Sequence, residues 1–402
     1  MAAILLSLAF AGCGPAAVDD ALTVATTWPE IERSDWEGRV RQSPSARPIR
    51  WLVLAPGDDL SRLATRKDPP DLILGLPAIA LEALSRRALL EPGGPGQPAW
   101  RIAPLGRLGY VATAGRPEVV LPLDLPSGLT FDDPRRDPAA RAWAQTILDA
   151  GAWRAGYARL VLAARGPRPP GRRPGSAVSA VLRGEAGAAP VLDADRLQSR
   201  RRSDLQFIVI DDGRIQYRGI AAVRGARHAS EARALIDEQA LLVSLATPDA
   251  SATGSPDALA LLADLLGSTL VDANDELRAA WKAVEESGSP ARPRAWMTEP
   301  PPWPPASVAK ILRRDANAMP MVETLAAQVA PDADVRGWLL RSWLAPTRPV
   351  DGRLLRELAD AAGGRLVREP RFRAWLRGEW TAWARQRYRR VARRVRAGQG
   401  VS

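Results

Sequence analysis

Three short apolar runs near the N-terminus alternate with helix-like segments, and this alternation limits the folds open to the chain. The runs are LTVATTW at 22–28, IRWLVLAP at 49–56 and PDLILGLP at 70–77. Between the last two lies DDLSRLATR, whose leading aspartates suit the start of a helix. Buried strands that alternate with helices predict a parallel sheet in an α/β fold.

The carboxyl ends of these strands are the first place to expect a ligand. In an open parallel sheet, ligands bind in the loops that follow the strands. The residues there are Thr26, Thr27, Trp28, Gly75 and Pro77. Trp28 has a flat apolar face suited to stacking on a ligand, although packing in the core is the more common role of such a residue.

The middle of the chain combines a strand, a helix and a sharp turn. The segment 109–115 reads as a strand, and SGLTFDDPRRDPAARAWAQTIL joins a strand to a helix through an Asp-Pro turn. We expect that helix to cover 141–164, with weak points at Gly151 and Gly156. A further helix is expected to start at Ser176, as an N-cap, and to lead into a strand at 188–193.

These segments occur in an order that resembles a known family. TVATTW, PDLILGLPA, the Asp-Pro strand-helix pair, GSAVSAVLRGEAGAAPVLD and GIAAVRGARHASEARALIDEQ follow one another as in the extracellular solute-binding proteins of ABC importers, in the type 2 periplasmic-binding class. The resemblance covers about residues 20–245. It implies two α/β lobes that close on a small molecule, and a membrane permease as partner.

The resemblance also implies a division of the chain. We expect lobe 1 to comprise 20–105 plus 205–290, and lobe 2 to comprise 106–204. Residues 296–402 would form an all-helical extension that the family does not share. The whole is expected to be a monomer.

The second lobe adds candidate ligand contacts to those of the first. They are Asp132, Asp133 and Arg135 at the Asp-Pro turn, and Ser176 and Ala177 at a helix start. Free backbone N–H groups at a helix start can hold an anion. A plain capping role for Ser176 is an equally reasonable interpretation.

Cysteine and histidine are too scarce for the usual catalytic or metal sites. His228 is the only histidine, in a segment expected to be an exposed loop, and Cys13 is the only cysteine. The four tyrosines are isolated, unlike the adjacent tyrosines that ferric-ion members of the resembled class use. We therefore expect no metal, no cofactor and no catalytic residue, and a hydrolase that uses carboxylates alone is the remaining enzymatic alternative.

Cys13 follows a short apolar segment that resembles a lipoprotein signal. Residues 1–12 are mostly small or apolar and too short to span a bilayer, and AGCGP resembles the site at which bacterial lipoproteins are cleaved and acylated. Phe10, where leucine is usual, and the lack of a preceding basic residue depart from that pattern. We expect residues 1–12 to be removed and Cys13 to anchor the chain in the cell envelope, facing the periplasm.

Basic residues and tryptophans are concentrated at the C-terminal end. The net charge is +11, and residues 365–402, with twelve arginines and two glutamates, carry +10 of it. Seven of the fourteen tryptophans lie from Trp296 onward. Such helices can lie on anionic lipid, but we expect the aromatic stripe to pack inside and arginine to face solvent. No nucleic-acid motif accompanies the charge.

These observations favour a lipid-anchored solute-binding protein of an ABC-type importer. The alternative is an envelope interaction or scaffold lipoprotein that acts through its basic Trp/Arg helices and no longer transports. A cleft without converging polar groups would favour the alternative.

Overall fold

The computed structural model contains two compact units, each built from two segments of the chain. Unit 1 comprises Met1–Ala103 and Arg218–Ala246, and unit 2 comprises Pro104–Tyr217 and Thr247–Ser402. The residues that the structure describes are 20–26, 28, 30–42, 47–54, 60–76, 81, 84–93, 99–113, 119–120, 124–166, 168–173, 175–192, 205–210, 215–242, 256–287, 291–315 and 317–398. Residues 1–12, expected to form a signal peptide, and Cys13 lie outside them.

Unit 1 has helices on both faces of a sheet. Its elements are β1 (Leu22–Thr26), α1 (Glu30–Val40), β2 (Ile49–Val53), α2 (Leu60–Ala64), β3 (Leu72–Leu76), the end of β8 (Ile215–Ala222) and α8 (Ala229–Leu242). Strands β2, β1 and β3 are parallel, as predicted, and β8 runs antiparallel to β3. Successive residues of β1 face opposite cores: Val24 packs with residues of α1 and α8, and Ala25 with residues of α2.

A buried carboxylate joins three elements of unit 1. Asp71, just before β3, is 3% exposed and accepts hydrogen bonds from two backbone amides. These are the amides of Thr23 in β1, at 2.7 Å, and of His228 before α8, at 2.8 Å. The bonds compensate for burying the charge, because a buried carboxylate is tolerated only where donors surround it.

Unit 2 begins with an antiparallel sheet covered by helices. The long strand β4 (Trp100–Thr113) pairs antiparallel with β6 (Ala188–Leu192) and with β7 (Leu205–Ile210), and β5 (Val119–Val120) pairs parallel with β7. Tyr110 of β4 and Trp143 are fully buried, and the Trp143 indole donates to the Tyr110 hydroxyl at 2.7 Å.

The helix expected at 141–164 is two helices. They are α4 (Pro138–Asp149), which Asp137 caps, and α5 (Trp153–Ala164), and the break covers residues 150–152 at the predicted weak point Gly151. Gly156 does not break α5. A Cβ atom there would lie 2.8 Å from the carbonyl oxygen of Ile147, so glycine permits α4 and α5 to approach closely.

The rest of unit 2 is helical, apart from a two-stranded pairing. Its elements are α6 (Ser176–Leu182), α9 (Pro256–Leu266), the π-helical turn η2 (Gly267–Val271), α10 (Asn274–Glu286), α11 (Ala291–Thr298), β9 (Pro302–Trp303), α12 (Ala306–Arg314), α13 (Met319–Val329), α14 (Ala333–Leu344), β10 (Arg348–Pro349), α15 (Gly352–Asp360), the 3₁₀ turn η3 (Ala361–Gly364), α16 (Arg365–Arg368) and α17 (Pro370–Arg396). The expected α/β fold with C-terminal helices is thus confirmed.

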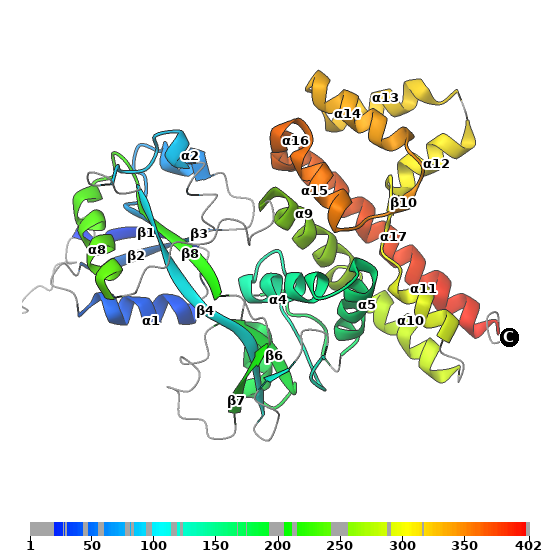
Figure 1. The fold of residues 1–402 in the computed structure, drawn as a ribbon, viewed down its shortest axis with the longest axis horizontal. Helices are drawn as coiled ribbons and strands as arrows, with labels where there is room; N and C mark the ends of the chain where they lie inside the picture. Colours follow the sequence, from blue (N-terminus) through cyan, green and yellow to red (C-terminus); the bar gives the residue numbers. More distant parts are fainter. Residues whose placement is uncertain are drawn as a thin grey trace, which may run out of the picture. The chain divides into compact units, whose positions relative to one another are not determined.

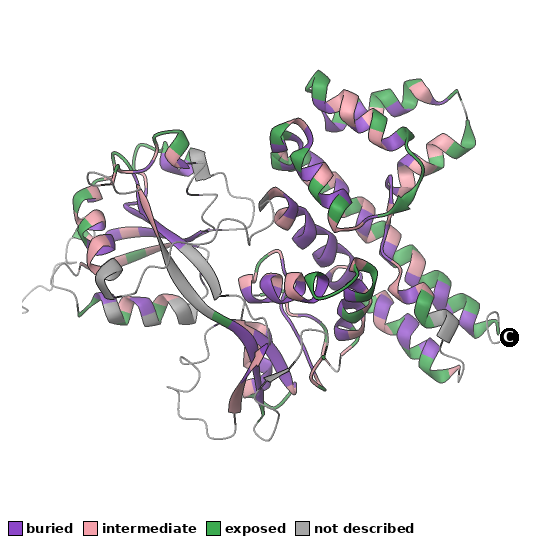
Figure 2. Ribbon diagram, viewed as in Figure 1, coloured by how far each residue is buried: buried purple, intermediate pink, exposed green. Residues whose placement is uncertain are grey.

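Helix α17 packs along α9, η2 and α10 over most of its length (Figure 1). Its buried side chains include Leu376, Trp380 and Val391, so the predicted aromatic stripe lies inside, as expected (Figure 2). Three ion pairs join partners at a nearly constant sequence separation: Asp257 with Arg368 at 3.0 Å, Asp264 with Arg373 at 2.7 Å, and Glu276 with Arg389 at 2.6 Å. Arg368 belongs to α16 and the other two arginines to α17. Because the separation is nearly constant, α16 and α17 run in the same direction as the row formed by α9, η2 and α10.

The lobe boundaries expected from the sequence differ from the observed units. Residues 205–217 and 247–290, expected in lobe 1, belong to unit 2, and residues 296–402 belong to the same unit rather than to a separate extension. The physical reason is the apolar face of α9 and α10, which α17 covers with its own buried stripe. The sequence analysis predicted the stripe of α17 but did not show which helices it covers.

The ion pair of Asp264 should contribute more to stability than the exposed pairs. Asp264 is 2% exposed and faces both Arg373 and Arg377. We expect Asp264→Ala to lower the free energy of unfolding by about 2 kcal/mol, because two guanidinium groups lose a buried partner. The control Asp257→Ala, at the exposed Arg368, should cost about 0–1 kcal/mol. Urea denaturation measures both; equal losses would contradict this ranking.

Candidate functional site

The structure brings three of the predicted contacts of unit 1 together at the ends of β1 and β3. Thr26 is fully buried, and its hydroxyl accepts a hydrogen bond from the Trp28 amide at 3.0 Å. Gly75 has a φ of +84°, and a Cβ atom there would overlap the Trp28 indole. Trp28 is 7% exposed and packs in the core, which is the more common role weighed above. Thr27 and Pro77 lie outside the described residues.

A polar corner in unit 2 unites the Asp-Pro turn with the segment before α6. Gly171 donates its amide to the Phe131 carbonyl at 2.8 Å, and the Asp133 amide donates to the Gly171 carbonyl at 2.8 Å. These bonds place Asp132 against the start of α6. A Cβ atom at Gly171 would overlap both Asp132 Oδ1 and Ser176 Oγ, so this close approach requires glycine.

Asp132 and Ser176, predicted separately as ligand contacts, touch each other in this corner. Asp132 Oδ1 accepts hydrogen bonds from Ser176 Oγ at 2.5 Å and from the Ala177 amide at 3.0 Å. Ser176 is the first residue of α6 and follows Gly175, which occupies the N-cap position with a φ of +76°. The Ala177 amide, which the sequence analysis offered to an anionic ligand, is therefore used by Asp132.

The carboxyl of Asp132 is held largely in its protonated form. Asp132 is 2% exposed, and its Oδ2 has no hydrogen-bond partner among the described residues. Burial raises the pKa of Asp132 to about 8, and the neighbouring carboxylate of Asp137 raises it too, whereas the bonds from Ser176 and Ala177 lower it. Near neutral pH this group is therefore mostly a neutral carboxylic acid, and its Oδ1 accepts the bonds from Ser176 and Ala177.

Arg135 is held by two carboxylates. Its guanidinium contacts Asp133 at 2.6 Å and Asp272, after η2, at 2.7 Å and 2.8 Å. Burial lowers the pKa of Arg135, but the hydrogen bonds to Asp272 and Asp133 outweigh that effect and leave it raised. A Cβ atom at Gly267 would overlap this guanidinium. Arg135 therefore ties the Asp-Pro turn to the π-helical turn.

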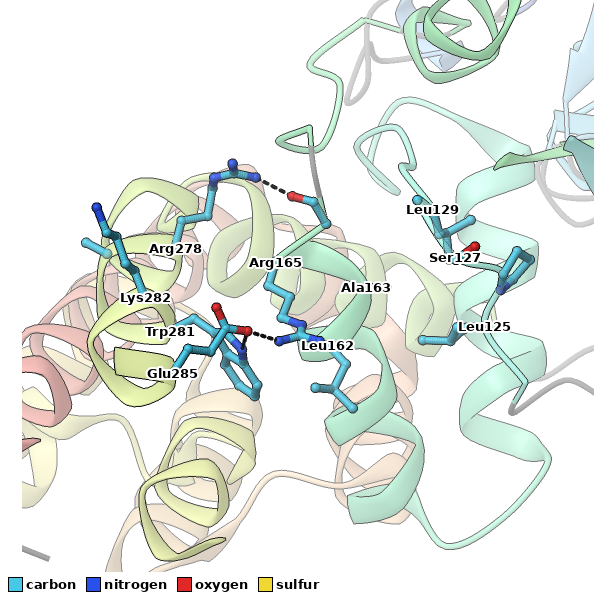
Figure 3. Close-up of a pocket in the computed structure, with 14 residues that line it drawn as sticks. Leu125, Ser127, Leu129, Leu162, Ala163, Arg165, Arg278, Trp281, Lys282 and Glu285 are labelled. Carbon is cyan, nitrogen blue, oxygen red and sulfur yellow. Dashed lines mark hydrogen bonds and ion pairs between the residues drawn. The ribbon is translucent and has the colours of Figure 1, made fainter. Parts of the chain in front are cut away.

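A hollow of about 760 Å³ lies elsewhere in unit 2 (Figure 3). The loop 125–129, the end of α5 and one side of α10 line it. Its polar side chains contact one another: Arg165 lies over the ring of Trp281, 5.0 Å from the centroid, and forms an ion pair with Glu285. Trp281 also donates to Glu285 at 3.1 Å. No sequence-predicted site residue lines this hollow.

The described residues offer no metal site and no membrane-spanning helix. No group of three His, Cys, Asp or Glu side chains among them is placed to hold a metal ion. None of the helices in the described part of the chain is both long and apolar enough to cross a membrane. His228 precedes α8 in a loop, as expected, but the loop is not exposed at this residue, which is 9% exposed, because its amide is bound to Asp71.

Sequence reasoning missed three residues that shape these sites. Asp137 is followed by a proline, as Asp133 is. This Asp-Pro pattern could have indicated that Asp137 caps α4. Gly171 lies in the Pro- and Arg-rich segment RGPRPPGRRPG, whose composition carries no signal for a site. Asp272 carried no signal, because it meets Arg135 across 137 residues of sequence.

Comparisons of the sequence with protein-family models and with curated proteins find no match. Comparison of the fold finds similar solved structures, all at low identity. They include iron-bound HitA from Pseudomonas aeruginosa (15% identity, 54% of this chain and 79% of that chain, TM-score 0.40), the periplasmic binding protein AfuA from Actinobacillus pleuropneumoniae with fructose-6-phosphate (15%, 59% and 87%, 0.42) and the sulfate-binding protein SubI from Mycobacterium tuberculosis (17%, 55% and 81%, 0.38). At these values the similarity identifies neither a ligand nor a site.

The raised pKa of Asp132 predicts a specific pH dependence of stability. A carboxyl whose pKa is higher in the folded state contributes stability that is full below pH 4 and is lost as the pH rises to about 8. The amide of Asp132→Asn resembles the protonated acid and does not titrate. The melting temperature of this variant relative to the natural protein should therefore rise between pH 4 and 8 and level off above.

The control is Asp132→Ala, which also removes the titration but loses the bonds to Ser176 and Ala177. Its melting temperature should lie below that of the Asn variant by the same amount at every pH. Differential scanning fluorimetry across the pH range measures all three proteins. A pH-independent difference between the natural protein and Asp132→Asn would contradict the assignment.

Proposed function

We propose that this chain is the solute-binding component of an ABC-type importer. It binds a small molecule outside the cytoplasm, and Cys13 anchors it by lipid in the cell envelope. A membrane permease would recognise the ligand-bound form. The order of sequence motifs from TVATTW to GIAAVRGARHASEARALIDEQ first suggested this function.

The observation that carries the proposal is the discontinuous α/β unit. Unit 1 ends its first segment at Ala103 and resumes at Arg218, so the chain leaves it, builds part of a second unit and returns. The chain crosses between the units three times: the first two crossings fall within strands β4 and β8, and the third lies between Ala246 and Thr247. Two units joined by paired crossings can change their relative orientation by small backbone rotations, and solute-binding proteins use such hinge motion.

The polar corner of unit 2 supports a role in ligand binding. Ser176 is partly exposed, and its hydroxyl lies within hydrogen-bond distance of two acceptors, Asp132 Oδ1 at 2.5 Å and the Arg173 carbonyl at 2.6 Å, while its own oxygen keeps acceptor capacity. The Asp132 carboxyl beside it lies beneath a helix start and is polar without carrying a full charge. Such a corner suits a hydroxyl-bearing or weakly anionic solute rather than a cation.

Binding is tested by a thermal-shift screen of residues 14–402 against sugars, oxyanions, amino acids, polyamines and metal ions. A micromolar ligand at a hundredfold excess over its dissociation constant adds about 2.7 kcal/mol to the stability of the folded state. We expect one of the first two classes to raise the melting temperature. Failure of every class would contradict the proposal and favour the scaffold alternative.

The compound that binds then tests the corner by isothermal titration calorimetry. Ser176→Ala should weaken binding about tenfold, the effect of one lost hydrogen bond. Ser179→Ala is the matched control, because Ser179 lies on the same helix and its hydroxyl donates to the Gly175 carbonyl of the same segment, with no bond to another described element. Equal affinities of the two variants would exclude the corner from the binding site.

The lipid anchor is tested separately by metabolic labelling with an alkyne fatty acid in a bacterial host. The natural chain should incorporate label and remain with the membrane fraction. Cys13→Ser should lose both properties, because no other cysteine exists to carry the acyl group. Label retained by the Cys13→Ser variant would contradict acylation at this residue.

A further inference from the structure

The acidic partners of α17 end before its arginines do. Along the parallel contact, Asp264 and Glu276 form ion pairs with arginines of α17. The last of these arginines in the sequence is Arg389, which pairs with Glu276 of α10. One turn further on, the neighbouring positions of α10 are apolar or basic, as at Ala279 and Lys282. The last three turns, Arg385–Arg396, contain seven arginines and no acidic residue.

Arginines on the two flanks of these turns have partners. On one flank, Arg385 donates to the Asp272 carbonyl at 2.9 Å, next to the Glu276 and Arg389 pair. On the other flank, Arg387 pairs with Glu299, and Arg394 lies over the ring of Trp296, 5.4 Å from its centroid.

Three arginines between the flanks have no such partner. Arg390, Arg393 and Arg396 are exposed, and their side chains form no hydrogen bond or ion pair with any described residue. They are spaced three residues apart, so they lie on one side of the helix, over a length of about 9 Å. We call these three residues the arginine face.

We propose that the arginine face binds an anionic phospholipid surface. The face and such a surface have complementary charges. Guanidinium groups along one side of a straight helix can contact several phosphate headgroups of a planar layer at the same time. The face has no apolar residue to insert, so the attraction is electrostatic. The proposal stands independently of solute binding, because it concerns only the exposed end of α17.

The geometry fits lipid better than nucleic acid. Proteins that bind single strands combine a basic groove with exposed aromatic rings on which bases stack. The tryptophans nearest this face carry guanidinium groups over their rings, Arg387 over Trp383 at 5.3 Å and Arg394 over Trp296. The arginine face is also the outer side of a helix rather than a groove.

The test measures cosedimentation with phosphatidylcholine vesicles that contain 0–40% phosphatidylglycerol. The parent protein is the full chain carrying Cys13→Ser, so that acylation cannot contribute. Its partitioning should increase with the anionic fraction and decrease with salt. The variant Arg390→Gln/Arg393→Gln/Arg396→Gln should bind on the order of 100-fold more weakly to the most anionic vesicles, because each basic residue near such a surface contributes about a fivefold change.

The matched control removes the same charge elsewhere in unit 2. Arg314, Arg341 and Arg356 are also exposed, and changing all three to glutamine should leave partitioning within about twofold of the parent. Equal losses in both triple variants would show a net-charge effect and overturn the proposal. The proposal would also be overturned if binding of the parent protein did not depend on the anionic fraction of the vesicles. Tighter binding to single-stranded DNA than to vesicles, at equal phosphate concentration, would overturn it as well.

Circular dichroism and thermal melting accompany both triple variants. Neither should change, because all six side chains are exposed and the buried stripe of α17 is untouched. A melted variant would be replaced by Arg→Lys substitutions at the same positions, which keep the charge. Those variants should bind vesicles as the parent does, and failure to do so would count against an electrostatic surface.

Discussion

The parallel contact between α17 and the rod formed by α9, η2 and α10 organises unit 2. The π-helical turn in that rod displaces backbone carbonyls from their usual helical partners, and side chains of α17 donate to them: Tyr388 to the Thr269 carbonyl at 3.3 Å and Arg385 to the Asp272 carbonyl at 2.9 Å. Buried Asp264 adds a charged link. Because Arg135 reaches from the Asp-Pro turn to Asp272, the polar corner and the helical core share one network.

This network changes how the predicted site residues are to be understood. Arg135 is attractive as an anion ligand when it is considered alone, but its donors are directed at Asp133 and Asp272. The Ala177 amide is bound to Asp132. The Ser176 hydroxyl is partly exposed and lies between the Asp132 carboxyl, whose pKa burial raises, and the Arg173 carbonyl. The chemistry of the corner is therefore that of neutral hydrogen-bonding groups, and strong cationic attraction is not available there.

Local sequence patterns predicted elements well and partners poorly. The runs at 22–28, 49–56 and 70–77 became β1, β2 and β3, because apolar β-branched segments bounded by turn residues carry their own signal. The unit boundaries and the Asp132–Ser176 contact depend on which segments meet. An amphipathic pattern predicts that a helix face will be buried but does not identify the segment that buries it. Residues 256–286 were therefore expected in lobe 1, whereas they belong to unit 2. A capping interpretation of Ser176 likewise gave no hint of Asp132, which lies 44 residues earlier.

The discontinuous units also set an order of assembly during synthesis. When the ribosome has completed residue 103, unit 1 still lacks β8 and α8, and the edge of β3 that β8 will pair with is bare. Unit 2 remains open longer, because α17, which covers α9 and α10, is made after all the other described elements of the unit. Neither core can close while its final segment is missing. A chain interrupted between α10 and α17 therefore exposes the apolar faces of α9 and α10, the kind of surface that chaperones and proteases recognise.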